Sequence, residues 1–99
     1  MYKVTRNENF EKDLESIISY LIENFSRDVC TKYLDYLTEQ IENLSYFPYI
    51  GFTAMIPKHP NYRALISRKN LVLYSIDETK KEVTLNAIVS ADKKYSNLN

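Results

Sequence analysis

The sequence predicts an α+β fold in which an N-terminal strand and an antiparallel helical hairpin precede a three-stranded antiparallel meander (β-α-α-β-β-β). Two amphipathic helical patterns joined by a very short link occupy the first half of the chain, and three strand-like runs occupy the second half. One domain over residues 1–99 is expected, because a chain of 99 residues buries too little surface to form two domains.

The first two elements are a short strand and a helix. Apolar and polar residues alternate over residues 2–6, which predicts a strand with one buried face. Asn7 can cap the following helix, and Glu8 and Glu11 suit its first turn because the helix dipole favours negative charge there. That helix is expected to run through about residue 25, with an apolar face formed by Phe10, Leu14, Ile17, Leu21 and Phe25.

A second helix follows almost at once and completes the hairpin. Ser26 is placed to cap it and Pro48 to stop it. Its apolar stripe consists of Val29, Tyr33, Leu37, Ile41 and Leu44, widened by Cys30 and Leu34. Two helices of roughly five turns, joined by so short a link, are expected to lie antiparallel over a shared core.

Residues 48–60 hold all three prolines, the only glycine and the only histidine, and predict a loop between the two halves. A loop of this length is often functional, but packing of Phe52, Met55 and Ile56 onto the core is the favoured explanation. Strands are predicted over residues 62–67, 71–76 and 83–89. The consecutive apolar residues 71–74 predict a central strand covered on both faces, and residues 90–99 read as a polar tail.

Composition excludes several classes of protein. One cysteine, Cys30, forms no internal disulfide, and with His59 alone beside it there is no ligand set for a metal. A single glycine, Gly51, is too few for a phosphate-binding loop, so no cofactor is expected. No apolar run approaches the roughly 20 residues of a membrane span, and the N-terminus lacks a signal-peptide core. A cytoplasmic protein without a metal or cofactor is therefore expected.

Charge is balanced overall but divided between the halves. The chain carries 13 Lys and Arg against 13 Asp and Glu, so it has no general attraction for nucleic acid or anionic lipid. Residues 1–57 have a net charge of −4 and residues 58–99 a net charge of +4. Either the basic half meets an anionic partner, or residues such as Lys80 and Lys81 only solubilise a hairpin tip.

Four motifs occur in a fixed order along almost the whole chain. They are Asp13-Leu14-x-x-Ile17-x-x-Tyr20-Leu21; Ile41-x-x-Leu44-x-x-Phe47-Pro48-x-x-Gly51; Tyr62-Arg63-x-Leu65 followed by Asn70–Asp77; and Val83-x-Leu85-x-Ala87-Ile88-Val89 leading into Ala91-Asp92-Lys93-Lys94-Tyr95. In this order the motifs resemble the RelE/ParE superfamily of bacterial toxins from type II toxin–antitoxin modules.

The resemblance implies a toxin that inhibits bacterial growth and is masked by a cognate antitoxin protein. One branch of the superfamily poisons DNA gyrase by binding it, and the other cleaves messenger RNA on the ribosome. The long helical hairpin resembles the ParE-like branch, since members of the RelE branch usually have shorter helices. The zero net charge favours the same branch, because a ribosome-bound nuclease must dock against dense phosphate. Two alternatives stay open: a RelE-like, ribosome-dependent mRNA endoribonuclease, and an inactive toxin fold that only binds a partner.

The candidate catalytic residues apply only to the nuclease alternative. RNA cleavage without a metal requires cations that stabilise the phosphorane and groups that move protons. The resemblance implies Arg63, Lys93 or Lys94, and Tyr95 for these roles, although Tyr95 could instead anchor the C-terminus on the sheet.

The candidate binding residues are the cations of the second half and one histidine. They are Lys58, His59, Arg63, Arg68 and Lys69. Arg63 could equally pair with a helix carboxylate, and His59 could be a loop residue without a role. If the protein acts on gyrase by binding, the hairpin face, the basic C-terminal edge and tyrosines such as Tyr36, Tyr46 and Tyr49 are candidates for the interface.

Overall fold

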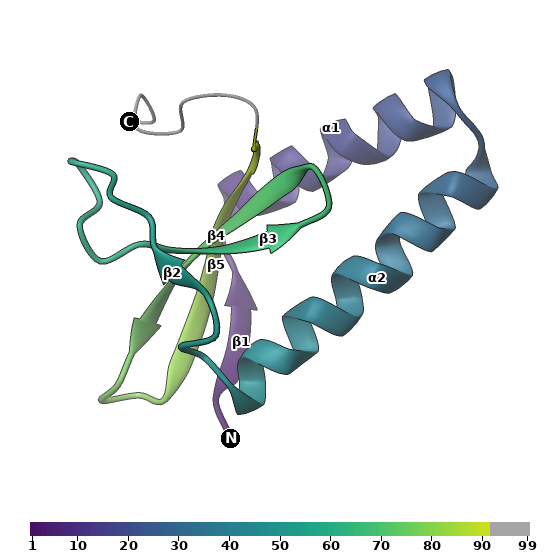
Figure 1. The fold of residues 1–99 in the computed structure, drawn as a ribbon. Helices are drawn as coiled ribbons and strands as arrows, with labels where there is room; N and C mark the ends of the chain where they lie inside the picture. The colour runs from purple at the N-terminus through teal and green to yellow at the C-terminus, as the bar shows by residue number, and fades with distance from the viewer. Residues whose placement is uncertain (92–99) are drawn as a thin grey trace.

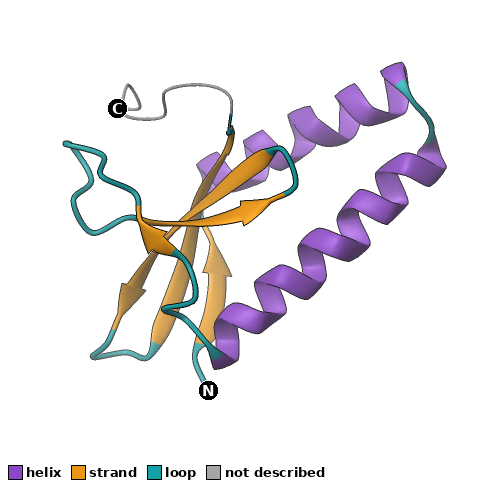
Figure 2. Ribbon diagram, in the orientation of Figure 1, coloured by secondary structure: helices purple, strands orange, loops and turns teal. Residues whose placement is uncertain are grey.

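The computed structural model describes residues 1–91 and has two helices beside one mixed sheet (Figures 1 and 2). In chain order the elements are β1 (Lys3–Arg6), α1 (Glu8–Asn24), α2 (Arg27–Tyr46), β2 (Phe52–Thr53), β3 (Arg63–Ser67), β4 (Asn70–Asp77) and β5 (Glu82–Ser90). The strand order is β1-β5-β4-β3-β2, with β1 parallel to β5 and every other pair antiparallel. The predicted α+β class and the meander are confirmed.

Both predicted helix caps are present. The Asn7 side chain accepts a hydrogen bond from the Phe10 amide at 2.9 Å, and the Ser26 hydroxyl accepts one from the Val29 amide at 3.1 Å. Each bond satisfies an amide that has no partner inside its helix. Helix α2 ends at Tyr46, just before Pro48, as expected of a residue that cannot continue a helix.

The core consists of two layers on opposite faces of the sheet. On the helical side, Val72 and Tyr74 of β4 pack with a cluster that includes Phe10 and Leu44. On the other side, Leu71 and Leu73 pack with Ala54, Ile56 and Ala64. Strand β4 is therefore central and buried on both faces, as its unbroken apolar run predicts.

The connection between α2 and β3 is more ordered than the predicted loop. It contains β2, which pairs with β3, and a bridge between Ile56 and His59. Ile56 packs onto the core as expected, being 1% exposed, but Phe52 and Met55 are 42% and 77% exposed, so the prediction was wrong for these two side chains. Ala54 takes their place, because the strand pairing turns Ala54 and Ile56 inward.

The helical hairpin covers the sheet over only part of its length. The two helices separate from their turn towards their other ends, and the turn lies beyond the sheet (Figure 1). Phe10 and Leu44, near the open ends, are fully buried, whereas Phe25 and Val29 at the turn are 61% and 40% exposed. The two helices share a core as predicted, but that core ends before the turn, where Phe25 and Val29 of the predicted stripes are exposed. Neither helix of residues 1–91 is long and apolar enough to cross a membrane.

Candidate functional site

Arg63 holds the segment that follows α2. It opens β3 between Thr53 on β2 and Tyr74 on β4. Its Nη2 donates hydrogen bonds to the carbonyl oxygens of Tyr49 at 3.1 Å and Gly51 at 2.5 Å, and its guanidinium lies over the Tyr49 ring at 5.2 Å. Within residues 1–91, Arg63 thus contacts backbone carbonyls and a ring, and not the helix carboxylate that the sequence left possible.

Tyr74 fixes the same segment from beneath. Its buried hydroxyl donates to the Pro48 carbonyl at 2.7 Å and accepts from the Gly51 amide at 3.1 Å. A Cβ on Gly51 would lie 2.4 Å from the Ala64 carbonyl oxygen and 2.6 Å from the Tyr74 hydroxyl, both too close for any side chain. The Pro48-x-x-Gly51 motif therefore places the Pro48 carbonyl and the Gly51 amide where the Tyr74 hydroxyl can bind both.

Glu78, at the tip of the β4–β5 hairpin, gathers three side chains. Its carboxylate accepts hydrogen bonds from Tyr2 at 2.7 Å, from Tyr49, and from Lys81 at 2.9 Å. These bonds, that from Tyr49 foremost, lower the pKa of Glu78 from its ordinary 4.5 to about 2, and the carboxylate raises the pKa of both tyrosines. Glu78 could not be identified from the sequence, because no local pattern reports a contact between residues as far apart as Tyr2 and Glu78.

The predicted binding residues divide into two groups. At one end of β3, Arg63 lines a pocket of about 200 Å3 with Tyr62, whose ring stacks on His59 at 4.3 Å between centroids. Lys58 is exposed in the same connection. Arg68 and Lys69 form the β3–β4 turn at the other end of β3. At the rise per residue of an extended chain, Arg68 lies roughly 16 Å from Arg63. Lys93, Lys94 and Tyr95 lie outside the described residues.

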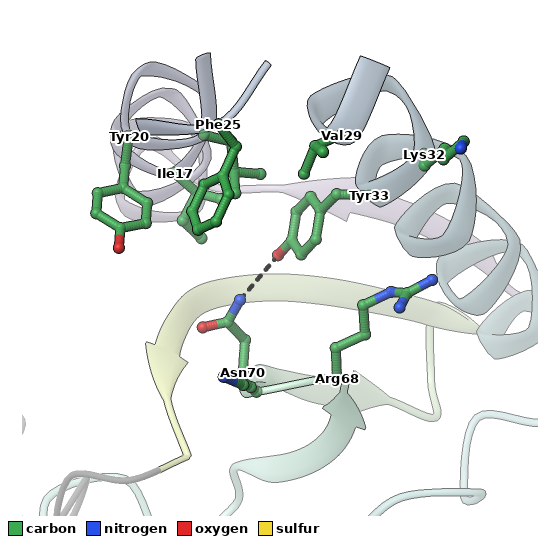
Figure 3. A pocket seen from close by; sticks show the side chains of 10 residues that line it. Ile17, Tyr20, Phe25, Val29, Lys32, Tyr33, Arg68 and Asn70 are labelled. Carbon is green, nitrogen blue, oxygen red and sulfur yellow. Dashed lines mark hydrogen bonds between the residues drawn. The ribbon is translucent and has the colours of Figure 1, made fainter. Parts of the chain in front are cut away.

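Arg68 and Lys69 border a groove of about 560 Å3 between the helical hairpin and the β3–β4 turn (Figure 3). We call it the hairpin groove and define it by Phe25, Val29, Tyr33, Arg68, Lys69 and Asn70. Asn70 donates a hydrogen bond to the Tyr33 hydroxyl at 3.1 Å, which links the start of β4 to α2 across the groove (Figure 3). Burial raises the pKa of Tyr33. The Arg68 guanidinium lies 4.5 Å from the centre of the Tyr36 ring.

A second apolar surface follows α2. We call it the aromatic patch, and it consists of Tyr46, Phe47, Tyr49, Ile50 and Phe52, which are 42–64% exposed. Of the tyrosines predicted for an interface, Tyr46 and Tyr49 are exposed here, while Tyr36 is half-buried beneath Arg68. Large exposed apolar groups in one place mark surfaces that bind other proteins, and aromatic residues are enriched in such interfaces.

The residues described offer neither a metal site nor a reactive thiol. In residues 1–91, no three side chains of His, Cys, Asp or Glu lie together as metal ligands would. Cys30 is 4% exposed on the inner face of α2, where it packs as a small apolar residue.

The fold is that of solved toxins. One chain of the chromosomal ParDE toxin–antitoxin system from P. aeruginosa superposes with a TM-score of 0.75 at 16% identity, over 91% of this chain and 96% of that chain. The RelBE2 complex from Mycobacterium tuberculosis gives 0.62 at 13% identity, covering 90% and 96%. The E. coli RelBE complex gives 0.60 at 14% identity, covering 94% and 100%. These likenesses define the class as a RelE/ParE-like toxin fold.

The family follows from the sequence itself. Residues 4–95 match the model of the ParE toxin of the type II toxin–antitoxin system parDE. The chain therefore belongs to the ParE toxin family. No curated protein matches the sequence significantly.

Proposed function

We propose that the chain is a growth-inhibiting toxin that acts in the cytoplasm, as a single domain over residues 1–99, by binding and poisoning DNA gyrase. The observation that favours gyrase binding over RNA cleavage is the pair of hydrogen bonds that Arg63 makes within the protein. A nuclease would need this guanidinium for the phosphorane charge, but its Nη2 is held by the carbonyls of Tyr49 and Gly51. Arg63 therefore acts on the protein itself and positions the aromatic patch.

Binding as the mode of action is supported by the surface. The patch consists of several large apolar groups that are exposed and close together in the sequence, and exposed aromatic residues of this kind suit association with another protein. The zero net charge of the chain gives no general attraction to the phosphates of a ribosome.

We further propose a cognate antitoxin as the protein that masks this surface. The similar chains from P. aeruginosa and M. tuberculosis come from a ParDE toxin–antitoxin system and a RelBE2 toxin–antitoxin complex. An antitoxin should suppress growth inhibition when it is expressed together with this chain.

Supercoiling of relaxed plasmid by purified gyrase tests the proposal. The wild-type chain should inhibit supercoiling, and Phe47→Ser in the aromatic patch should weaken the inhibition. Ile66→Ser is the matched control, because Ile66 is similarly exposed, at 58% against 64%, but lies on β3 outside the patch. Full supercoiling activity in the presence of excess wild-type chain would refute gyrase as the target.

A RelE-like, ribosome-dependent mRNA endoribonuclease is the second candidate. It is favoured by the pocket beside Arg63 and by the buried Nε of Arg63, which has no hydrogen-bond partner among the described residues. A cell-free translation reaction with mapping of messenger 5′ ends decides between the two. New ends that need translating ribosomes and vanish with Arg63→Ala would establish the nuclease. Absence of growth inhibition on induction would leave only the inactive, partner-binding toxin fold.

A further inference from the structure

The aromatic patch continues an acidic face of α2. Asp35, Glu39 and Glu42 are exposed and follow one another at spacings of four and three along this helix. Residues at these spacings are neighbours on one face of a helix. Tyr46 comes four residues after Glu42, so it lies on the same face, and it belongs to the aromatic patch. Exposed carboxylates therefore lead directly into exposed aromatic rings.

This face of α2 is turned away from the core. The buried residues of the helix include Tyr33, Leu37 and Leu44, which pack in the core on the helical side of the sheet. At about 3.6 residues per turn, Glu39 and Glu42 lie on the opposite side of the helix from these three. The carboxylates are therefore open to another molecule.

The three acids have no cationic partner among residues 1–91. The ion pairs of that region engage other carboxylates, namely Glu8, Glu11, Asp28 and Glu78. Arg68 lies over the Tyr36 ring on one side of the helix. Lys3 lies near the end of α2, since the Tyr2 amide binds the Ser45 carbonyl, but it enters none of these ion pairs either. The outer face of α2 therefore carries uncompensated negative charge.

Two cations lie beside the patch itself, and both are engaged within the protein. Arg63 donates hydrogen bonds to the carbonyls of Tyr49 and Gly51. Lys81 pairs with Glu78 at 2.9 Å, and the same carboxylate accepts the Tyr49 hydroxyl. The charge that remains free next to the aromatic rings is therefore the negative charge of α2.

We propose that the aromatic patch and the acidic face of α2 form one docking surface for a basic surface of the toxin's target protein. Apolar side chains of the partner lie against Phe47 and Ile50, and its Arg or Lys side chains meet Glu39 and Glu42. Arginine suits the junction of the two halves, because a guanidinium both stacks on an aromatic ring and pairs with a carboxylate. That this partner is gyrase rests on the proposed function, whereas the surface and its preference for cations do not.

Charge argues against other occupants of this surface. Nucleic acid and anionic lipid have the same sign as the outer face of α2 and would be repelled by it. A second copy docked through the same surface would bring two acidic faces together, because an isologous contact pairs identical surfaces. A basic protein surface is the occupant that compensates the charge and covers the rings.

A peptide-display library of random sequences, selected on the immobilised full chain, tests the proposal. Peptides that also bind Phe47→Ser are removed by counter-selection, so that only those that need the patch remain. Phe47→Ser keeps the fold, because the Phe47 side chain is 64% exposed. The charge of the surviving peptides is then an independent result, and they should combine Arg or Lys with apolar residues.

The affinity of a synthesised, enriched peptide is next measured by fluorescence anisotropy. Glu42→Lys should weaken binding about tenfold, because it places like charges opposite one another. Glu23→Lys is the matched control, since it makes the same change at an exposed acid near the end of α1, and it should stay within about twofold. Raising the salt to about 0.5 M should weaken wild-type binding several-fold, because salt screens exposed charges.

A charge swap separates recognition from loss of structure. A peptide in which Glu replaces the enriched basic residue should bind Glu42→Lys more tightly than it binds the wild-type chain. A damaged fold cannot produce this inversion, because it would weaken both peptides. Melting temperatures of all variants verify that each is folded.

Several results would overturn the proposal. One is a selection that enriches nothing, or that enriches acidic or uncharged peptides. Another is equal loss of affinity in Glu42→Lys and Glu23→Lys. A dimer that dissociates on Phe47→Ser in sedimentation would assign the surface to a second copy. A chain ending at Ala91 that binds the peptide about tenfold more tightly would assign it to the chain's own end, which carries Lys93 and Lys94.

The proposed function can fail or stand separately. If the peptides behave as expected but the wild-type chain leaves gyrase supercoiling unchanged, gyrase is refuted as the target and the docking surface stands. If the chain inhibits supercoiling and Glu42→Lys inhibits as well as Glu23→Lys does, gyrase stands and the acidic face is refuted as part of the surface that binds it.

Discussion

Removal of the Tyr74 hydroxyl should destabilise the protein and release the segment that follows α2. Tyr74→Phe keeps the buried ring but removes both the donor to the Pro48 carbonyl and the acceptor for the Gly51 amide. The two backbone groups lie where little water can replace the hydroxyl, since Pro48 and the Tyr74 ring are buried. The substitution therefore tests whether a single side chain anchors this segment.

The magnitude follows from the two bonds. Each contributes about 1 kcal/mol net, and unsatisfied buried partners add to the loss, so Tyr74→Phe should lower the free energy of unfolding by about 2 kcal/mol. For a domain of 99 residues, this corresponds to a fall of about 10 °C in melting temperature. Tyr20→Phe is the matched control, because the Tyr20 side chain is 57% exposed, and it should change the stability by less than about 0.5 kcal/mol.

Urea unfolding followed by circular dichroism measures both variants. A double-mutant cycle with Arg63→Met adds the second anchor, since Arg63 holds the Gly51 carbonyl in the same segment. The two substitutions together should cost less than their sum by at least about 0.5 kcal/mol, because a released segment has nothing further to lose. A loss below about 0.5 kcal/mol for Tyr74→Phe, with an unchanged denaturant slope, would refute the anchoring argument.

Three further outcomes are expected from thermal and denaturant unfolding. Gly51→Ala should cost about 1–3 kcal/mol, because its Cβ would lie 2.4 Å from the Ala64 carbonyl oxygen; unchanged stability would contradict the close approach. Ser67→Ala should raise stability by about 0.5–1 kcal/mol, because the buried Ser67 hydroxyl has no partner among the described residues; a loss would reveal a hidden bond. The lowered pKa of Glu78 contributes stability above pH 4.5 that disappears as the pH falls towards about 2. Glu78→Gln should therefore flatten this part of the stability profile, and an identical acid limb would refute the role of the carboxylate.

The elements themselves could be predicted because their signals are local. Asn7 and Ser26 cap the helices as their side-chain chemistry dictates, and Pro48 ends the second helix. The unbroken apolar run in β4 marked the central strand, because only a strand covered on both faces buries consecutive side chains. The short β2 was not predicted, since a two-residue strand has no periodicity and exists only through its pairing with β3.

The candidate site was only partly predictable. The sequence identified Arg63 and Arg68 as candidates, but it did not reveal that they lie at opposite ends of β3. Arg63 binds backbone carbonyls, and Arg68 lies over the Tyr36 ring. Glu78 escaped notice because its partner Tyr2 lies 76 positions away in the chain. Contacts of this kind depend on topology, and no local pattern encodes them.

The sequence by itself determined the fold class, the family and the length of the apolar stripe on the helical hairpin. All three are properties of residue order, set by helix and strand periodicity and by the spacing of the motifs. The tertiary structure alone decided how much of that stripe the sheet covers. Coverage depends on where the chain returns: the strands meet the open end of the hairpin and leave Phe25 and Val29 at its turn exposed. The hairpin groove is the result of that mismatch in length.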